Sequence, residues 1–88
     1  MFVLELSFND HPRRLAARAA HRQRLAALRA AGQLVMAGPW QDDSGALLVF
    51  RADRAGMDTI MAADPYYTTP GVTVTALRQW KPIVGDAP

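Results

Sequence analysis

The chain has 88 residues, half of them hydrophobic and a fifth charged, a composition that predicts one folded domain and argues against a disordered chain. It contains no cysteine, which excludes disulfide bonds, thiolate metal sites and a thiol nucleophile. The formal net charge is only +2, yet six arginines and no acidic residue lie between Asp10 and Asp42, a pattern that fits an anion-binding surface or simply a solvated helix face.

The first half of the chain predicts a strand, a long helix and a second strand. Hydrophobic and polar residues alternate over residues 2–8, which is the period-two pattern of a strand. Residues 13–31 are almost wholly alanine, arginine, leucine and glutamine, with a proline just before and a glycine just after, and therefore predict a helix. A short apolar strand over residues 34–37 follows and ends at Gly38 and Pro39.

The second half predicts a strand, a short helix and a final strand. A polar turn over residues 41–45 leads into the apolar run 46–50, so these residues form a hairpin with the preceding strand. Asp53 can cap a helix over residues 54–63, which a proline then ends. Alternation returns over residues 72–80 and predicts the fourth strand.

The order βαββαβ is that of the ferredoxin-like α+β sandwich, in which two helices cover one face of a four-stranded antiparallel sheet. We expect this single domain over residues 1–82 and a flexible tail over residues 83–88. The strands at 34–37 and 46–50 are apolar on both faces, whereas a sheet with one wet face alternates apolar with polar. We therefore expect the helix-free face to be buried in a homodimer, which can assemble further.

Membranes, nucleic acids and metals are each disfavoured as partners by a different feature. The first seven residues include Glu5 and are too short for a secretory signal, and no apolar run approaches membrane-spanning length, so we expect a cytoplasmic protein. The first and third strands lack the aromatic, glycine-containing motif of RNA-recognition sheets. Two histidines without cysteines or suitably spaced carboxylates do not predict a metal site, and we expect no cofactor.

Polar residues interrupt the stripe of the long helix that should face the core. Positions 14, 18, 21, 25 and 28 share one face, on which Arg14, Arg18 and His21 precede two leucines. These three side chains indicate a polar pocket. The alternative is that both arginines reach to water and His21 is an ordinary, partly buried histidine.

The predicted topology brings further residues to the same end of the sheet. Asp64 follows the second helix, and Gly38 and Pro39 close the second strand. If His21 faces Asp64, the carboxylate fixes the imidazole tautomer and raises the pKa of His21, which suits general acid and base chemistry. An Asp-Pro pair is also a common way to end a helix, and Tyr66 fits either a ligand pocket or a dimer seam.

Four segments of the chain together resemble the YciI-like (YCII-related) family. They are residues 20–25 around His21, residues 31–39 ending in Gly-Pro, residues 63–66 with Asp-Pro, and residues 77–82 with Trp80. The resemblance implies a ferredoxin-like fold of the dimeric α+β barrel group and an active site centred on a histidine and an aspartate, here His21 and Asp64. Members tied to a reaction act in the breakdown of ring compounds, including dehalogenating elimination. Such members are few, so the substrate does not transfer. Residues 67–70 depart from the family's smaller, more acidic pattern, which leaves the shape of the pocket open.

Two functional hypotheses follow. The first is a small, cofactor-free lyase, isomerase or hydrolase-like enzyme acting on a small, anionic or ring-type organic metabolite. The second is a non-catalytic dimeric module that binds or senses such a metabolite. For the first hypothesis we predict two catalytic residues and five that bind substrate: His21 and Asp64, and Arg14, Arg18, Gly38, Pro39 and Tyr66.

Overall fold

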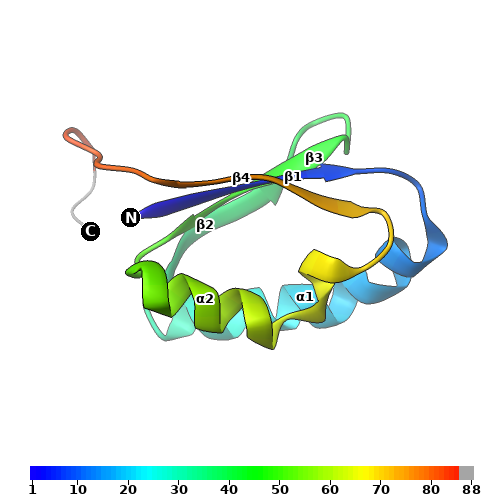
Figure 1. Ribbon diagram of the computed structural model, residues 1–88, viewed down its shortest axis with the longest axis horizontal. Helices are drawn as coiled ribbons and strands as arrows, with labels where there is room; N and C mark the ends of the chain where they lie inside the picture. The colour runs from blue at the N-terminus through cyan, green and yellow to red at the C-terminus, as the bar shows by residue number, and fades with distance from the viewer. Residues whose placement is uncertain (86–88) are drawn as a thin grey trace.

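The computed structural model describes residues 1–85 and confirms the ferredoxin-like α+β architecture. Its elements are β1 (Phe2–Phe8), α1 (Pro12–Ala30), β2 (Leu34–Pro39), β3 (Gly45–Phe50), α2 (Arg54–Ala63), the 3-10 helix η1 (Pro65–Thr68) and β4 (Val72–Gln79). The strands form one antiparallel sheet in the order β2-β3-β1-β4, and both helices lie against the same face of it (Figure 1). Residues 86–88 of the predicted tail lie outside the described residues, and the domain boundary at residue 82 stays a prediction.

The hydrophobic core lies between the sheet and the two helices. Alternate residues of β1 supply its centre, and Leu4, which is fully buried, pairs with Leu48 of β3 and Leu77 of β4. Helix α2 adds Met57, which is also fully buried. The period-two pattern of the first strand therefore marks the face that packs against the helices.

Helix α1 begins and ends within one residue of its predicted bounds. The Nδ1 atom of His11 accepts a hydrogen bond from the backbone N–H of Arg13 at 3.1 Å, which caps the first turn. Gly32 follows the helix with a φ of +79°, a left-handed conformation that favours glycine. Within residues 1–85, no helix is both long and apolar enough to cross a membrane.

Strand β2 departs from the simple alternation expected of it. A register shift lies between Leu34, which pairs with Phe50, and Met36, which pairs with Val49. Because of this shift, Leu34 is buried beneath the sheet while Met36 is 66% exposed on the opposite face. Regular period-two alternation over residues 34–37 would place these two side chains on one face, and the register shift overturns that expectation.

The helix-free face of the sheet is apolar along its β2–β3 half. A shallow groove of about 620 Å³ runs across this face, and its strand residues include Val3, Val35, Met36, Leu47, Val49 and Ala76. Glu5 and Arg78, on β1 and β4, add charge toward the other half. In Figure 1 this face lies above the sheet, on the side away from α1 and α2.

Candidate functional site

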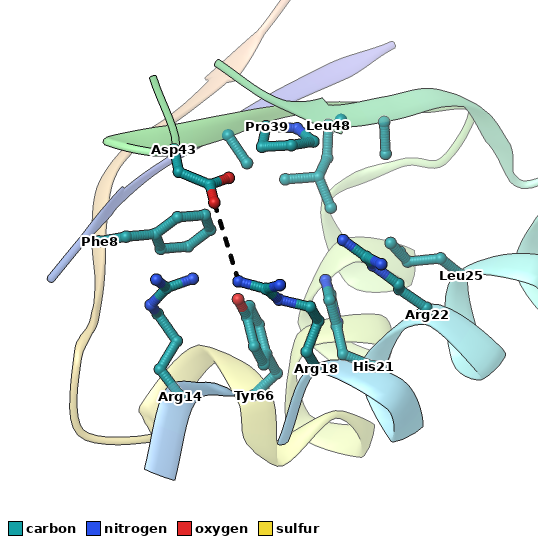
Figure 2. A pocket seen from close by; sticks show the side chains of 13 residues that line it. Phe8, Arg14, Arg18, His21, Arg22, Leu25, Pro39, Asp43, Leu48 and Tyr66 are labelled. Atoms are coloured by element: carbon teal, nitrogen blue, oxygen red, sulfur yellow. Dashed lines mark ion pairs between the residues drawn. The ribbon is translucent and has the colours of Figure 1, made fainter. Parts of the chain in front are cut away.

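A cavity of about 330 Å³ lies between α1 and the end of the sheet formed by the β2–β3 hairpin (Figure 2). Its volume is at the lower end of the range for small-molecule sites. Small and apolar residues form one part of its lining: Phe8, Leu25, Ala37, Gly38, Pro39, Ala46 and Leu48. Polar residues form the other part: Arg14, Arg18, His21, Arg22, Asp43 and Tyr66. Six of the seven predicted site residues thus border one cavity, and the seventh, Asp64, lies behind His21.

His21 and Asp64 are hydrogen-bonded although 43 positions separate them in the chain. The Nδ1 atom of His21 lies 2.7 Å from Oδ2 of Asp64, and both residues are buried. The other carboxylate oxygen, Oδ1, accepts a hydrogen bond from the backbone N–H of Tyr66 at 3.0 Å. Asp64 therefore fills both roles that the sequence left open, because it ends α2 and starts η1 while orienting the imidazole.

Two tyrosines of η1 enclose the imidazole of His21. The Tyr66 ring stacks on it, with centroids 3.9 Å apart and planes 8° apart, and the Tyr67 ring approaches edge-on at 5.5 Å. Tyr66 is buried on the helix side of the sheet, so it belongs to the cavity and not to the helix-free face. Since Nδ1 is bound to Asp64, the Nε2 atom is the nitrogen left to serve the cavity.

The net effect of these surroundings is to lower the pKa of His21 below its ordinary value of 6.5. Burial is the largest cause, and it outweighs the hydrogen bond and charge of Asp64, which raise the pKa. The predicted effect of Asp64, which is to raise the pKa of His21, is present, but burial lowers this pKa by more. The lowered pKa favours the uncharged imidazole, in which Nδ1–H donates to Asp64 and the lone pair of Nε2 can accept a proton.

Arg14 is a buried cation with neutral partners. The residue is only 2% exposed. Its Nε–H donates a hydrogen bond to the backbone oxygen of Asn9 at 2.6 Å, and its guanidinium carbon lies 4.6 Å from the centroid of the Phe8 ring. Among the ion pairs formed by residues 1–85, none includes Arg14. The guanidinium borders the cavity beside Phe8 (Figure 2), so its charge is available to a ligand.

Arg18 spans the cavity one turn further along α1. Its Nη2 lies 3.9 Å from Oδ2 of Asp43 in the β2–β3 hairpin, and both side chains are partly exposed (Figure 2). Gly38 and Pro39 line the cavity from β2. An exposed ion pair of this length contributes little to stability, but it gives Arg18 an acidic partner that Arg14 lacks.

Several lining residues escaped the sequence analysis. Phe8 ends an alternating strand on its core face, which was a usable signal. Asn9 lies outside the lining and accepts the hydrogen bond of Arg14 through its backbone oxygen, a role that no side-chain pattern predicts. Arg22 lies next to the stripe that holds His21 and borders the same cavity, while Leu25, which belongs to that stripe, borders the cavity as well. Among the described residues 1–85, no group of three or more histidine or acidic side chains could hold a metal ion.

Comparison with known families gives one match. The model of the family described as the YCII-related domain matches residues 1–81. This segment contains both helices and all four strands, together with every residue of the cavity. A search of the curated proteins found no match to the chain.

Proposed function

Because this chain belongs to the YCII-related domain family, we propose that it is a small enzyme that uses His21 and Asp64 for acid and base catalysis on a small organic anion. One observation carries the proposal: a buried imidazole is bound to a carboxylate through Nδ1 while it borders a cavity rich in arginine. Buried titratable pairs of this kind, set in a cavity, are frequent at sites of proton transfer.

In the proposed mechanism, Nε2 of His21 takes a proton from a C–H or O–H group of the bound substrate. Asp64 stabilises the resulting imidazolium through the Nδ1–H hydrogen bond and keeps the ring in place. The same proton then returns to another atom of the substrate, which gives an isomerisation, or leaves with a departing group, which gives an elimination. Every step uses side chains of this chain and requires no cofactor.

The apolar part of the lining has a role in this mechanism. It excludes water from the reacting atoms, and in a less polar cavity the attraction between an arginine and a substrate anion is stronger than in water. It also keeps His21 neutral until a substrate proton is taken, because burial opposes the charged form.

We also propose that the enzyme is a homodimer that buries the helix-free face of the sheet. Met36 is 66% exposed there, and it shares the groove with Val3, Leu47 and Val49. A second copy of the same face would cover these side chains, and an exposed apolar face of this kind is typical of an interface.

Hydrogen exchange at carbon tests the enzymatic proposal without knowledge of the natural substrate. The protein is incubated in D2O with ketones that carry a carboxylate, namely pyruvate, 4-oxopentanoate, and 3- and 4-oxocyclohexanecarboxylate, and loss of the C–H signal beside the ketone is followed by NMR. We expect catalysed exchange with at least one compound, reduced about 100-fold or more in His21→Ala.

His11→Asn is the matched control, because this second histidine is exposed, lies outside the lining of the cavity, and is replaced by a residue that also caps helices. Its exchange rate should equal that of the wild type. Saturable binding of a compound without any exchange would contradict catalysis and support the metabolite-binding alternative. Equal rates in the wild type and His21→Ala would remove His21 from the mechanism.

A further inference from the structure

We infer that Arg14 and the hydroxyl of Tyr66 bind the single negative group of the ligand at one end of the cavity, while His21 acts at the other. We call the binding site formed by these two residues the anion seat. The ligand is then a small apolar monoanion whose negative group is several bonds from the atom that reacts. The position of the reacting atom rests on the proposed function. The anion seat itself concerns binding alone.

The burial of Arg14 is the first step of the argument. A buried charge is costly unless an opposite charge or several hydrogen bonds compensate it. Here the guanidinium has one backbone oxygen, from Asn9, and the face of one aromatic ring, from Phe8. Its terminal nitrogens are left to the cavity (Figure 2). A carboxylate accepting two parallel hydrogen bonds from them would supply the missing compensation.

Tyr66 supplies a second donor at the same place. Its ring is held by the stack on His21 and by an edge contact with Phe8, with centroids 6.1 Å apart. Figure 2 shows its hydroxyl pointing into the cavity between the side chains of Arg14 and Arg18. Among the described residues, no hydrogen bond uses this hydroxyl. It can therefore donate to a ligand oxygen without giving up an existing partner.

The other arginines of the cavity indicate that only one negative charge is needed. Arg18 already has a carboxylate partner in Asp43. Arg22 is exposed, so water compensates its charge. Arg14 alone is both buried and without an acidic partner among the described ion pairs. A ligand with one carboxylate balances this site, whereas a second charge would face the apolar wall of Ala37, Ala46 and Leu48.

The spacing along α1 separates the anion seat from the proposed base. Positions 14 and 21 are seven residues apart, which is about 10 Å along a helix axis at a rise of about 1.5 Å per residue. Figure 2 shows Arg18 and Tyr66 between Arg14 and His21. A group bound by Arg14 is therefore separated from the imidazole by the Arg18 and Tyr66 side chains, and the ligand body, such as a six-membered ring, has to span that gap.

Binding of unreactive compounds tests the anion seat independently of catalysis. Cyclohexanecarboxylate and its neutral analogue cyclohexanecarboxamide are titrated by calorimetry into the wild type, Arg14→Gln, Arg13→Gln and Tyr66→Phe. We expect the carboxylate to bind the wild type about tenfold more tightly than the amide, and Arg14→Gln to lose about that factor. Arg13→Gln removes the same charge from an exposed neighbour outside the cavity lining and should stay within about twofold of the wild type.

The remaining outcomes decide the inference even if Arg14→Gln does not fold. The inference is overturned if the wild type binds the acid and the amide equally well, or does not bind the acid at all. If Tyr66→Phe binds the acid as tightly as the wild type does, the role of the Tyr66 hydroxyl is overturned. Equal losses in Arg13→Gln and Arg14→Gln would show attraction by overall charge only. The spacing is tested by the deuterium exchange described above, in which 4-oxocyclohexanecarboxylate should exceed pyruvate and the reverse order would contradict it. Binding without exchange leaves the anion seat standing and removes the proposed catalysis.

Discussion

The rings of His21 and Tyr66 lie face to face, with their centroids 3.9 Å apart and their planes 8° apart. One carboxylate holds both members of this pair, because Asp64 accepts a hydrogen bond from the imidazole and another from the backbone N–H of Tyr66. The position of the imidazole in α1 is therefore determined largely by the residues that end α2. A substitution at Asp64 should therefore alter the environment of the His21 ring first.

Asp64→Asn should lower the pKa of His21 below its already lowered value, because the charge and hydrogen bond of Asp64 are what raise it. Proton NMR titration of the His21 ring measures this directly. Asp58→Asn, which removes an exposed carboxylate from the middle of α2, should leave the titration unchanged. A His21 pKa that does not move in Asp64→Asn would mean that the two side chains are not coupled in solution.

The stability of the fold should depend on pH through His21. Its pKa is lower in the folded state than the ordinary 6.5, so the unfolded chain binds the proton more readily. This contribution to stability is complete above pH 6.5 and declines as the pH falls below that value. Urea unfolding of the wild type and His21→Gln should show a smaller loss of stability on acidification in the variant. An identical pH dependence in both proteins would contradict the lowered pKa.

Tyr67→Phe should stabilise the protein by about 1 kcal/mol, because it removes a buried polar group that has no partner. The Tyr67 hydroxyl forms no hydrogen bond with the described residues, and burial raises the pKa of this phenol. Urea unfolding of the two proteins gives the difference in free energy. Tyr66→Phe is the comparison, since that hydroxyl borders the cavity and its loss should change stability by less than about 0.5 kcal/mol. A less stable Tyr67→Phe would mean that the hydroxyl has a partner in solution.

Gly71→Ala should cost about 3 kcal/mol, whereas Gly32→Ala should cost about 1 kcal/mol. Both glycines have positive φ angles, +96° and +79°, so each alanine meets a backbone penalty. A Cβ atom at position 71 would also lie 2.7 Å from the Cβ of His11, while position 32 is open. Thermal or urea unfolding of both variants isolates the steric part. Equal losses would show that the start of α1 can move away from Gly71.

Met36→Lys should convert the proposed dimer into a monomer of 9.6 kDa, because it places a charge on the apolar, helix-free face. Light scattering coupled to gel filtration measures the mass. Leu15→Lys makes the same kind of change at an exposed leucine on α1, away from that face, and should leave the assembly intact. A wild type that is already monomeric at micromolar concentration would rule out the proposed dimer.

The sequence predicted the fold well because the signals that determine it are local. Alternation marked β1 and β4, composition and flanking residues marked α1, and Pro65 marked the end of α2. The register shift in β2 could not be read in this way, since four consecutive apolar residues, 34–37, give no sign of where a strand changes face. The 3-10 helix η1 lies where the sequence indicated only the end of a helix, at Asp64 and Pro65.

The sequence predicted which residues form the site but not the burial and ring contacts that surround His21. Helical spacing and topology brought His21, Arg14 and Asp64 to one end of the sheet, as the structure shows. The net direction of the His21 pKa was missed, because it depends on how deeply the ring is buried relative to the strength of one hydrogen bond. The stack of Tyr66 on His21 was also missed, since it requires the path of η1.

The irregular path of β2 also affects how copies of this protein can meet. β2 is an edge strand, and regular edge strands expose a row of N–H and C=O groups on which another chain can add and aggregate. Here the register shift after Leu34 interrupts that row, and Pro39 contributes no N–H at its end. Extension of the sheet from one molecule into the next is thus discouraged at this edge. The face-to-face dimer that we propose would then give a closed assembly and not an open fibre.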